Sequence, residues 1–166
     1  MTKRIIAYAL TCAFALAGHA VMAQGTSVAF GGLKHDSKLP VEITADQLSV
    51  DQSTGKAVFV GNVLIGQGSM RLTAGKVDVI YGAGGGGNIS QLEATQGVTL
   101  TNGGEAVEAR TARYDLGSGA VVLTGSVLLT QGPNAISGDT MTIDLKTGVG
   151  TIDGRVKTIL QPGTSE

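Results

Sequence analysis

The sequence has little of what most catalytic sites and nucleic-acid surfaces are made from. It contains one cysteine, two histidines, three prolines and no tryptophan, and aromatic residues make up 4% of its 166 positions. A single cysteine, Cys12, excludes a disulfide within the chain. Twelve basic and thirteen acidic residues give a net charge of −1. No basic cluster stands out, which argues against nucleic-acid binding because phosphate contacts need concentrated positive charge.

Candidates for catalysis are correspondingly few. His35 is the one histidine after the N-terminal segment, and it precedes the region expected to fold, so a Ser-His-Asp site has no support. Asp51, Asp115 and Asp144 recur once per repeat beside turns, which favours turn chemistry over the paired carboxylates of a glycoside hydrolase. The run "GAGGGGN" (82–88) has no Lys-Ser/Thr step and opens no helix, so it is not a phosphate-binding loop. The sequence predicts a non-enzyme without cofactor or metal.

The first residues have the three parts of a secretory signal peptide. A basic pair at 3–4 precedes an apolar run at 5–17, and "VMA" at 21–23 is a small-residue cleavage site. We expect residues 1–23 to be removed after export, which takes Cys12 with them and leaves about 140 residues, enough for one domain core. An uncleaved membrane anchor is the alternative, although the apolar run is shorter than the about 20 residues that span a bilayer.

The rest of the chain repeats one pattern: an alternating strand, a turn rich in Gly, Ser or Thr, and a second strand with a glycine inside it. The four copies are "ADQLSVDQSTGKAVFVGNVLI" (45–65), "AGKVDVIYGAGGGGNISQLEATQGVTL" (74–100), "ARTARYDLGSGAVVLTGSVLL" (109–129) and "GDTMTIDLKTGVGTIDGRVKT" (138–158). Their starts are 29, 35 and 29 residues apart, and a glycine-rich insertion at 82–87 explains the longer spacing. We therefore predict an all-β, antiparallel fold of about four hairpin units.

Each unit carries a glycine in its second strand, at Gly61, Gly97, Gly125 and Gly154. Glycine weakens a strand interior, because it adds backbone entropy and leaves no side chain to pack. Parity along the strands puts these glycines on the inward, apolar face. There they would let the strand bend or let a ligand approach the backbone, and we expect a bend to be the main reason.

The same parity groups the large residues that face inward. They are Val41, Ile43, Leu48, Val50, Phe59, Val63, Ile65, Tyr114, Leu116, Leu123 and Val127. Parity conflicts between 41–43 and 48–50, which predicts a bulge or corner near Ala45–Asp46. Two interpretations of this inward set stay open: its members fill a packed core, or they line a surface that holds an apolar ligand.

Three stretches resemble a known family, the OstA-like periplasmic lipopolysaccharide-transport proteins. They are "PVEITADQLSVD" (40–51), "FVGNVLIGQGSMRLTAGKVDVIY" (59–81) and "ARYDLGSGAVVLTGSVLLTQG" (112–132). The resemblance extends over about residues 40–156, so we expect a folded domain at 39–158 between a flexible lead-in (24–38) and a flexible tail (159–166). The glycine insertion and the low aromatic content depart from the family pattern.

The resemblance implies an open, twisted β-jellyroll whose apolar groove binds lipopolysaccharide through its lipid A acyl chains. The inward set would line that groove, with Val41 and Ile43 near its opening. Protomers would join head-to-tail into a bridge across the periplasm. The bridge would run from the inner-membrane export complex and its anchored periplasmic component to the periplasmic domain of the outer-membrane translocon. Two alternatives remain, a membrane-anchored member of the same pathway and a structural β-solenoid without ligand.

Overall fold

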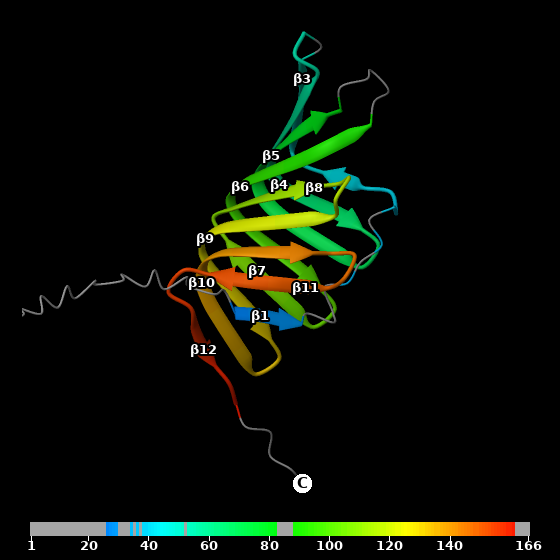
Figure 1. The fold of residues 1–166 in the computed structure, drawn as a ribbon. Helices are drawn as coiled ribbons and strands as arrows, with labels where there is room; N and C mark the ends of the chain where they lie inside the picture. Colours follow the sequence, from blue (N-terminus) through cyan, green and yellow to red (C-terminus); the bar gives the residue numbers. More distant parts are fainter. Residues whose placement is uncertain are drawn as a thin grey trace, which may run out of the picture.

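The computed structural model describes residues 26–29, 34, 36, 38–51, 53–82 and 88–161, and every regular element in them is a β-strand (Figure 1). The strands are β1 (Thr26–Ala29), β2 (Glu42–Thr44), β3 (Gln47–Asp51), β4 (Lys56–Gln67), β5 (Met70–Tyr81), β6 (Ile89–Asn102), β7 (Glu105–Ala109), β8 (Thr111–Asp115), β9 (Ala120–Gln131), β10 (Asn134–Asp144), β11 (Val149–Asp153) and β12 (Lys157–Ile159). They form one twelve-stranded sheet in which neighbours run antiparallel. The predicted all-β, antiparallel fold is confirmed.

The predicted hairpin units correspond to the pairs β3–β4, β5–β6, β8–β9 and β10–β11, and aspartates hold three of their turns. Asp51 Oδ1 accepts a hydrogen bond from the Ser53 N–H (2.9 Å), and Asp115 Oδ1 accepts one from the Ser118 N–H (2.7 Å). Asp144 Oδ1 accepts the equivalent bond from the Lys146 N–H (2.8 Å). The Ser53 hydroxyl, which also donates to Asp51, is the main reason that the pKa of this carboxyl is lowered. The aspartates therefore stabilise turns, as predicted.

The sheet is folded into two arms whose inner faces enclose the core. Its strand order is β1-β11-β10-β9-β7-β6-β5-β4-β2, with β3 beside β4, β8 between β6 and β9, and β12 beside β10. The long strands run through both arms. Each short strand pairs with only one half of a long strand. The short strands β3, β8 and β11 lie in arm 1, and β2, β7 and β12 lie in arm 2. The result is a jellyroll with β3 at one end and β12 at the other (Figure 1).

The corner between the arms is made by pairs of consecutive left-handed residues. The pairs are Gly61–Asn62, Gln96–Gly97, Gly125–Ser126 and Gly154–Arg155, with φ from 41° to 88°. Between Val60 and Val63 the register of β4 against β5 shifts, as at a bulge. A left-handed backbone is costly for residues with a Cβ, so glycine at one position of each pair makes the corner possible. The glycines of the repeat therefore serve the bend, as expected.

The glycines do not face the interior, contrary to the parity argument. A Cβ on Gly61 would lie 2.5 Å from Oδ2 of the exposed Asp46, and one on Gly125 would lie 3.0 Å from Cβ of the exposed Arg110. Parity fails here because two successive positive φ angles turn the chain outward. The Asp46 N–H donates a hydrogen bond to the Gly61 carbonyl (2.9 Å). The predicted corner at Ala45–Asp46 therefore lies beside the first left-handed pair and continues the corner between the arms.

Strands extend beyond both predicted boundaries of the domain. Thr26–Ala29, in the segment predicted as a flexible lead-in, pairs with β11 from Thr26↔Ile152 to Ala29↔Val149. This strand covers an edge that β11 would otherwise leave unpaired. At the other end, β12 reaches Ile159, the first residue of the predicted tail. The predicted signal peptide, His35, residues 83–87 of the predicted insertion at 82–87, and Pro162 lie outside the described residues.

Candidate functional site

Five residues of the inward set lie deep between the arms. They are Val63, Ile65, Tyr114, Leu123 and Val127, and each is at most 2% exposed. They come from β4, β8 and β9 and belong to one contiguous apolar cluster that extends from Ala57 to Ile152. The parity argument therefore placed these side chains correctly on the inner face. In this structure they pack against one another as a core.

Four further members of the set line the rim of this cluster. Val41, Ile43, Phe59 and Leu116 are half-buried and pack against the buried cluster. Ile43 on β2 pairs with Ile65 on β4, so it continues the inner face of arm 2 to its last strand. These four side chains are positions at which an apolar ligand can touch the inner face without first displacing buried side chains.

The remaining two, Leu48 and Val50, are 53% and 59% exposed. They lie on β3, where Leu48 pairs with Phe59 and Val50 pairs with Ala57, so they share the inner face of arm 1. Their exposure has a topological reason. β3 is the last strand of arm 1 at this end of the sheet, and no further strand of the described residues pairs beyond it. Sequence parity identified the face correctly, but it carries no information on which strand is the last.

A buried hydrogen bond crosses the interior from one arm to the other. The Tyr114 hydroxyl on β8 donates to Oε1 of Gln67 at the end of β4, at 2.9 Å. The Gln67 amide in turn donates to the Leu39 carbonyl (2.8 Å). Burial raises the pKa of Tyr114 above its usual value near 10. Gln67 therefore links the second arm, the first arm and the segment that leads into β2.

Gln67 belongs to a row of polar side chains that sequence analysis did not single out. They occupy the inward position next to each turn of arm 2, and they form what we call the inner polar row: Gln67, Asn102, Glu105, Gln131 and Asn134. Register places Asn102 opposite Glu105, Glu105 opposite Gln131, and Gln131 opposite Asn134. The available signal is the repeated turn sequence, "QG" at 67–68, "NGGE" at 102–105 and "QGPN" at 131–134.

Both ends of the stack present strand edges and apolar side chains. At the β3 end, Leu48 and Val50 are exposed, and among the described strands β2 and β3 each pair on one side only, with β4. At the other end, β12 pairs with β10 and with no further strand of the described residues, and Ile159 and Leu160 are exposed. Unpaired strand edges bind a further strand readily, so each end is suited to strand addition.

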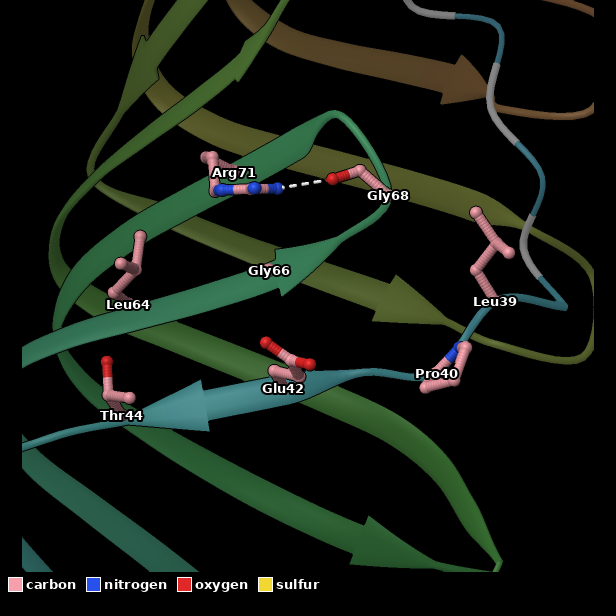
Figure 2. A pocket seen from close by; sticks show the side chains of 8 residues that line it. All are labelled: Leu39, Pro40, Glu42, Thr44, Leu64, Gly66, Gly68 and Arg71. Carbon is pink, nitrogen blue, oxygen red and sulfur yellow. Dashed lines mark hydrogen bonds between the residues drawn. The ribbon is translucent and has the colours of Figure 1, made fainter.

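A separate hollow of about 430 Å³ lies on the outer face of arm 2, at the β2 edge. Figure 2 shows Leu39 and Leu64 at its sides and Glu42 and Thr44 along β2. Arg71 borders it too, and its guanidinium donates to the Gly68 carbonyl (2.6 Å). None of the predicted inward residues lines this hollow, because it is formed by side chains of the opposite parity.

The described residues offer neither a metal site nor a membrane-spanning helix. No group of three or more His, Cys, Asp or Glu side chains is placed to hold a metal ion there. Within the same ranges, no helix is long and apolar enough to cross a membrane.

Comparison with known proteins agrees with this arrangement of strands. A family model described as "LptA/(LptD N-terminal domain) LPS transport protein" matches residues 42–149, which is most of the described region. The chain belongs to this family. The family is one of transport proteins, which agrees with the prediction of a non-enzyme.

Several individual proteins are similar to this chain, and two of them are LptA proteins. An uncharacterized protein of Rhizobium meliloti (strain 1021) is 33% identical over 131 residues, 71% of this chain and 70% of that protein. The lipopolysaccharide export system protein LptA of Haemophilus influenzae is 34% identical, over 63% of this chain and 64% of its own length. LptA of Escherichia coli (strain K12) is 31% identical over 55% and 52%. The chain therefore spans about half to two thirds of the length of these LptA proteins.

The fold has a solved counterpart. The crystal structure of LptH from Pseudomonas aeruginosa, described as the LptA homologous periplasmic component of the lipopolysaccharide transport device, superposes with a TM-score of 0.68. The match covers 76% of this chain and 99% of LptH, at 20% sequence identity. This confirms the jellyroll expected from the family resemblance.

Proposed function

We propose that this protein is a periplasmic carrier of lipopolysaccharide that forms part of a head-to-tail bridge between the two membranes. The observation that carries the proposal is the continuous apolar inner face between the arms, which runs from the buried cluster to the exposed Leu48 and Val50 on β3. Its family relationship to LptA supplies the ligand class and the compartment.

The physical need for such a carrier follows from the hydrophobic effect. Each CH₂ group exposed to water costs about 0.8 kcal/mol, so a twelve-carbon acyl chain costs on the order of 9 kcal/mol. Valine, isoleucine and leucine side chains attract an acyl chain without directional bonds. A lipid can therefore slide from one strand pair to the next without breaking specific contacts, while its sugar head stays in water.

The rim residues are where acyl chains enter in this proposal. Ile43 and Leu116 are half-buried, so an acyl chain can contact them at once and then spread the arms to reach Val63 and Leu123. Spreading costs the packing of the empty core, and the arriving acyl chains replace the contacts that are lost. The Tyr114–Gln67 hydrogen bond crosses from arm to arm.

The stack ends account for the proposed bridge. A second copy that adds its β12 end to the β2 and β3 edges would continue the sheet and cover Leu48 and Val50. Because one end binds the other, such contacts repeat and produce a filament rather than a closed dimer. The family relationship suggests the two outer partners, a membrane-anchored component at the inner membrane and the periplasmic domain of the outer-membrane translocon.

The test in cells is depletion followed by complementation. Depletion should leave newly made lipopolysaccharide in the inner membrane, which pulse labelling and membrane fractionation would measure. Ile43→Arg puts a charge on the inner rim and should fail to restore transport. Thr44→Arg puts the same charge on the outer face of the same strand and should restore it. Normal arrival of lipopolysaccharide in the outer membrane after depletion would refute the proposal.

A further inference from the structure

The inner polar row (Gln67, Asn102, Glu105, Gln131 and Asn134) is out of place in a purely apolar lipid groove. Its members stand on the same face as Ile65, Leu100, Val107, Leu129 and Ile136, the apolar positions two residues away on their strands. Gln67 and Asn102 are nearly as buried as those neighbours. Burying a polar side chain is unfavourable unless it is hydrogen-bonded, so a row that repeats on successive strands calls for a role.

Most members of the row have partners within the protein. The Ser69 hydroxyl donates to Asn102 Oδ1 (2.6 Å), and the Gln161 N–H donates to Asn134 Oδ1 (3.1 Å). Gln131 Nε2 donates to Glu105 Oε1. The row is thus an ordered set of hydrogen-bonding groups along the inner margin of arm 2.

The exception is one oxygen of Glu105, the acidic member of the row. Its side chain is 6% exposed, and its Oε2 atom is buried without a hydrogen-bond partner in the described part of the chain. A buried carboxylate oxygen without a donor is costly, more so than a neutral group. Glu105 directly follows an exposed turn, Gly103–Gly104.

We propose that Glu105 Oε2 accepts a hydrogen bond from a hydroxyl or amide N–H on the polar linkage between an acyl chain and the head of the bound lipid. This inference rests on the proposed carrier function and adds a polar contact to it. The acyl chain would lie among the apolar side chains of the inner face, and the linkage would lie at the row. The sugar head would then project past the turns into water.

The chemistry of the site favours this donor over a cation. Among the described residues, Glu105 belongs to no group of three or more His, Cys, Asp or Glu side chains that could hold a metal ion. The nearest partner, Gln131, donates to the other carboxylate oxygen and so leaves Oε2 oriented for a second donor. Glutamine and asparagine carry both donors and acceptors, so the rest of the row can bind ester carbonyls as well as hydroxyls. A linkage moving along the stack therefore meets a hydrogen-bonding group at successive strands.

The experiment compares neutral lipids that differ in one donor. The probes are methyl tetradecanoate, which has no donor, methyl 3-hydroxytetradecanoate and N-methyltetradecanamide, each tested by displacement of a fluorescent apolar dye from the full chain. We expect the two donor-bearing probes to bind about tenfold more tightly than the plain ester, which corresponds to about 1.4 kcal/mol. In Glu105→Met the preference should disappear, while the affinity for the plain ester stays the same.

Two further variants make the result interpretable. Glu108→Met, on the outer face of the same strand, should keep the tenfold preference. Glu105→Gln keeps an oxygen that can accept from Gln131 but places an NH₂ group, which only donates, at the position of Oε2, so it should lose the preference as Glu105→Met does. Glu105→Gln should leave the stability of the unliganded protein to urea nearly unchanged, because its oxygen can still accept from Gln131. Glu105→Met loses that bond and should lower the stability to urea.

The outcomes separate this inference from the carrier proposal. If wild type binds all three probes equally, the polar contact is refuted and the carrier function stands. If Glu105→Met weakens binding of the plain ester as much as that of the others, Glu105 serves the fold and the inference is refuted. If no probe displaces the dye, the interior does not accept acyl chains, and the carrier proposal fails first.

Discussion

The Tyr114 hydroxyl donates a hydrogen bond to Gln67 Oε1 across the interior, between two strands that are not neighbours in the sheet. Backbone ladders hold each arm together internally, and the corner joins the arms on one side. This side-chain bond joins them near the open side, at the level of the inner polar row. It therefore sets how far apart the arms stand when the interior holds no ligand.

The first prediction concerns Tyr114→Phe. Removing the hydroxyl should lower the free energy of unfolding by about 1 kcal/mol, the usual net value of one hydrogen bond. It should also make the arms easier to separate, so an apolar dye should bind the variant more tightly than wild type. Urea denaturation and dye titration measure the two effects. A variant that loses stability and binds the dye less well would contradict the role of this bond in spacing the arms.

The same tyrosine predicts a loss of stability at high pH. Burial raises the pKa of Tyr114 in the folded state, so the folded protein prefers the neutral phenol. Its contribution to stability is complete below the unfolded-state pKa near 10 and is lost as the pH rises from there through the folded-state pKa. Urea midpoints between pH 8 and 11 should fall more steeply for wild type than for Tyr114→Phe. Identical slopes would refute the prediction.

A matched pair on β9 tests the position of the core. Leu123 is 0% exposed and Leu128, five residues along the same strand, is 37% exposed. Leu123→Ala should cost about 2–5 kcal/mol of unfolding free energy because it leaves a cavity, whereas Leu128→Ala should cost about 0.5 kcal/mol or less. Similar costs for the two variants in urea denaturation would contradict the inward orientation of Leu123.

Two corner glycines with nearly the same backbone provide a test of the bend. Gly97 and Gly154 have φ of 81° and 78°, yet a Cβ on Gly97 meets nothing within 4 Å, while one on Gly154 would lie 2.6 Å from Asp139 Cβ. Gly97→Ala should cost about 1–2 kcal/mol for the left-handed backbone alone. Gly154→Ala should cost clearly more, because the adjacent strand must also move. Equal costs would show that steric crowding at the corner is unimportant.

The two ends of the stack are tested by mixing blocked variants. Leu48→Asp places a charge at the β3 end, and Ile159→Asp places one at the β12 end; both side chains are more than half exposed, so the fold should tolerate them. Each variant alone retains one working end and should be a monomer by analytical ultracentrifugation. An equimolar mixture should form dimers and nothing larger. Dimers of either variant alone would instead indicate that like ends join.

Much of this architecture could be predicted from the repeat. Alternation identified the strands, and parity placed Val63, Leu123 and Val127 on the inner face, because one buried face imposes a period of two on every strand. Parity was wrong for the corner glycines, since it assumes an extended backbone and two left-handed residues break that assumption. It also could not show that Leu48 and Val50 lie on the last strand, because exposure at an edge depends on tertiary order.

Glu105 shows where sequence reasoning ended for the candidate site. A glutamate beside "NGG" is typical of a solvated turn, and nothing local indicates that the side chain points inward. Its burial depends on the opposite strand, where Gln131 supplies the hydrogen bond to Oε1. The pairing of 105 with 131 is a property of the sheet register. The turn sequences around 67, 102 and 131 repeat, however, and that repetition is a usable signal for inward polar positions in related chains.

The carrier proposal is tested most directly by photo-crosslinking in living cells, with the photoreactive residue at Ile43 or Leu116 on the inner rim and at Glu42 as the control. Glu42 adjoins Ile43 on β2, and its side chain is exposed on the opposite face. The account predicts lipopolysaccharide adducts at Ile43 and Leu116 and none at Glu42. If the exported, folded protein gave no adducts at either inner position, the interior would be a packed core and the protein would not carry lipid.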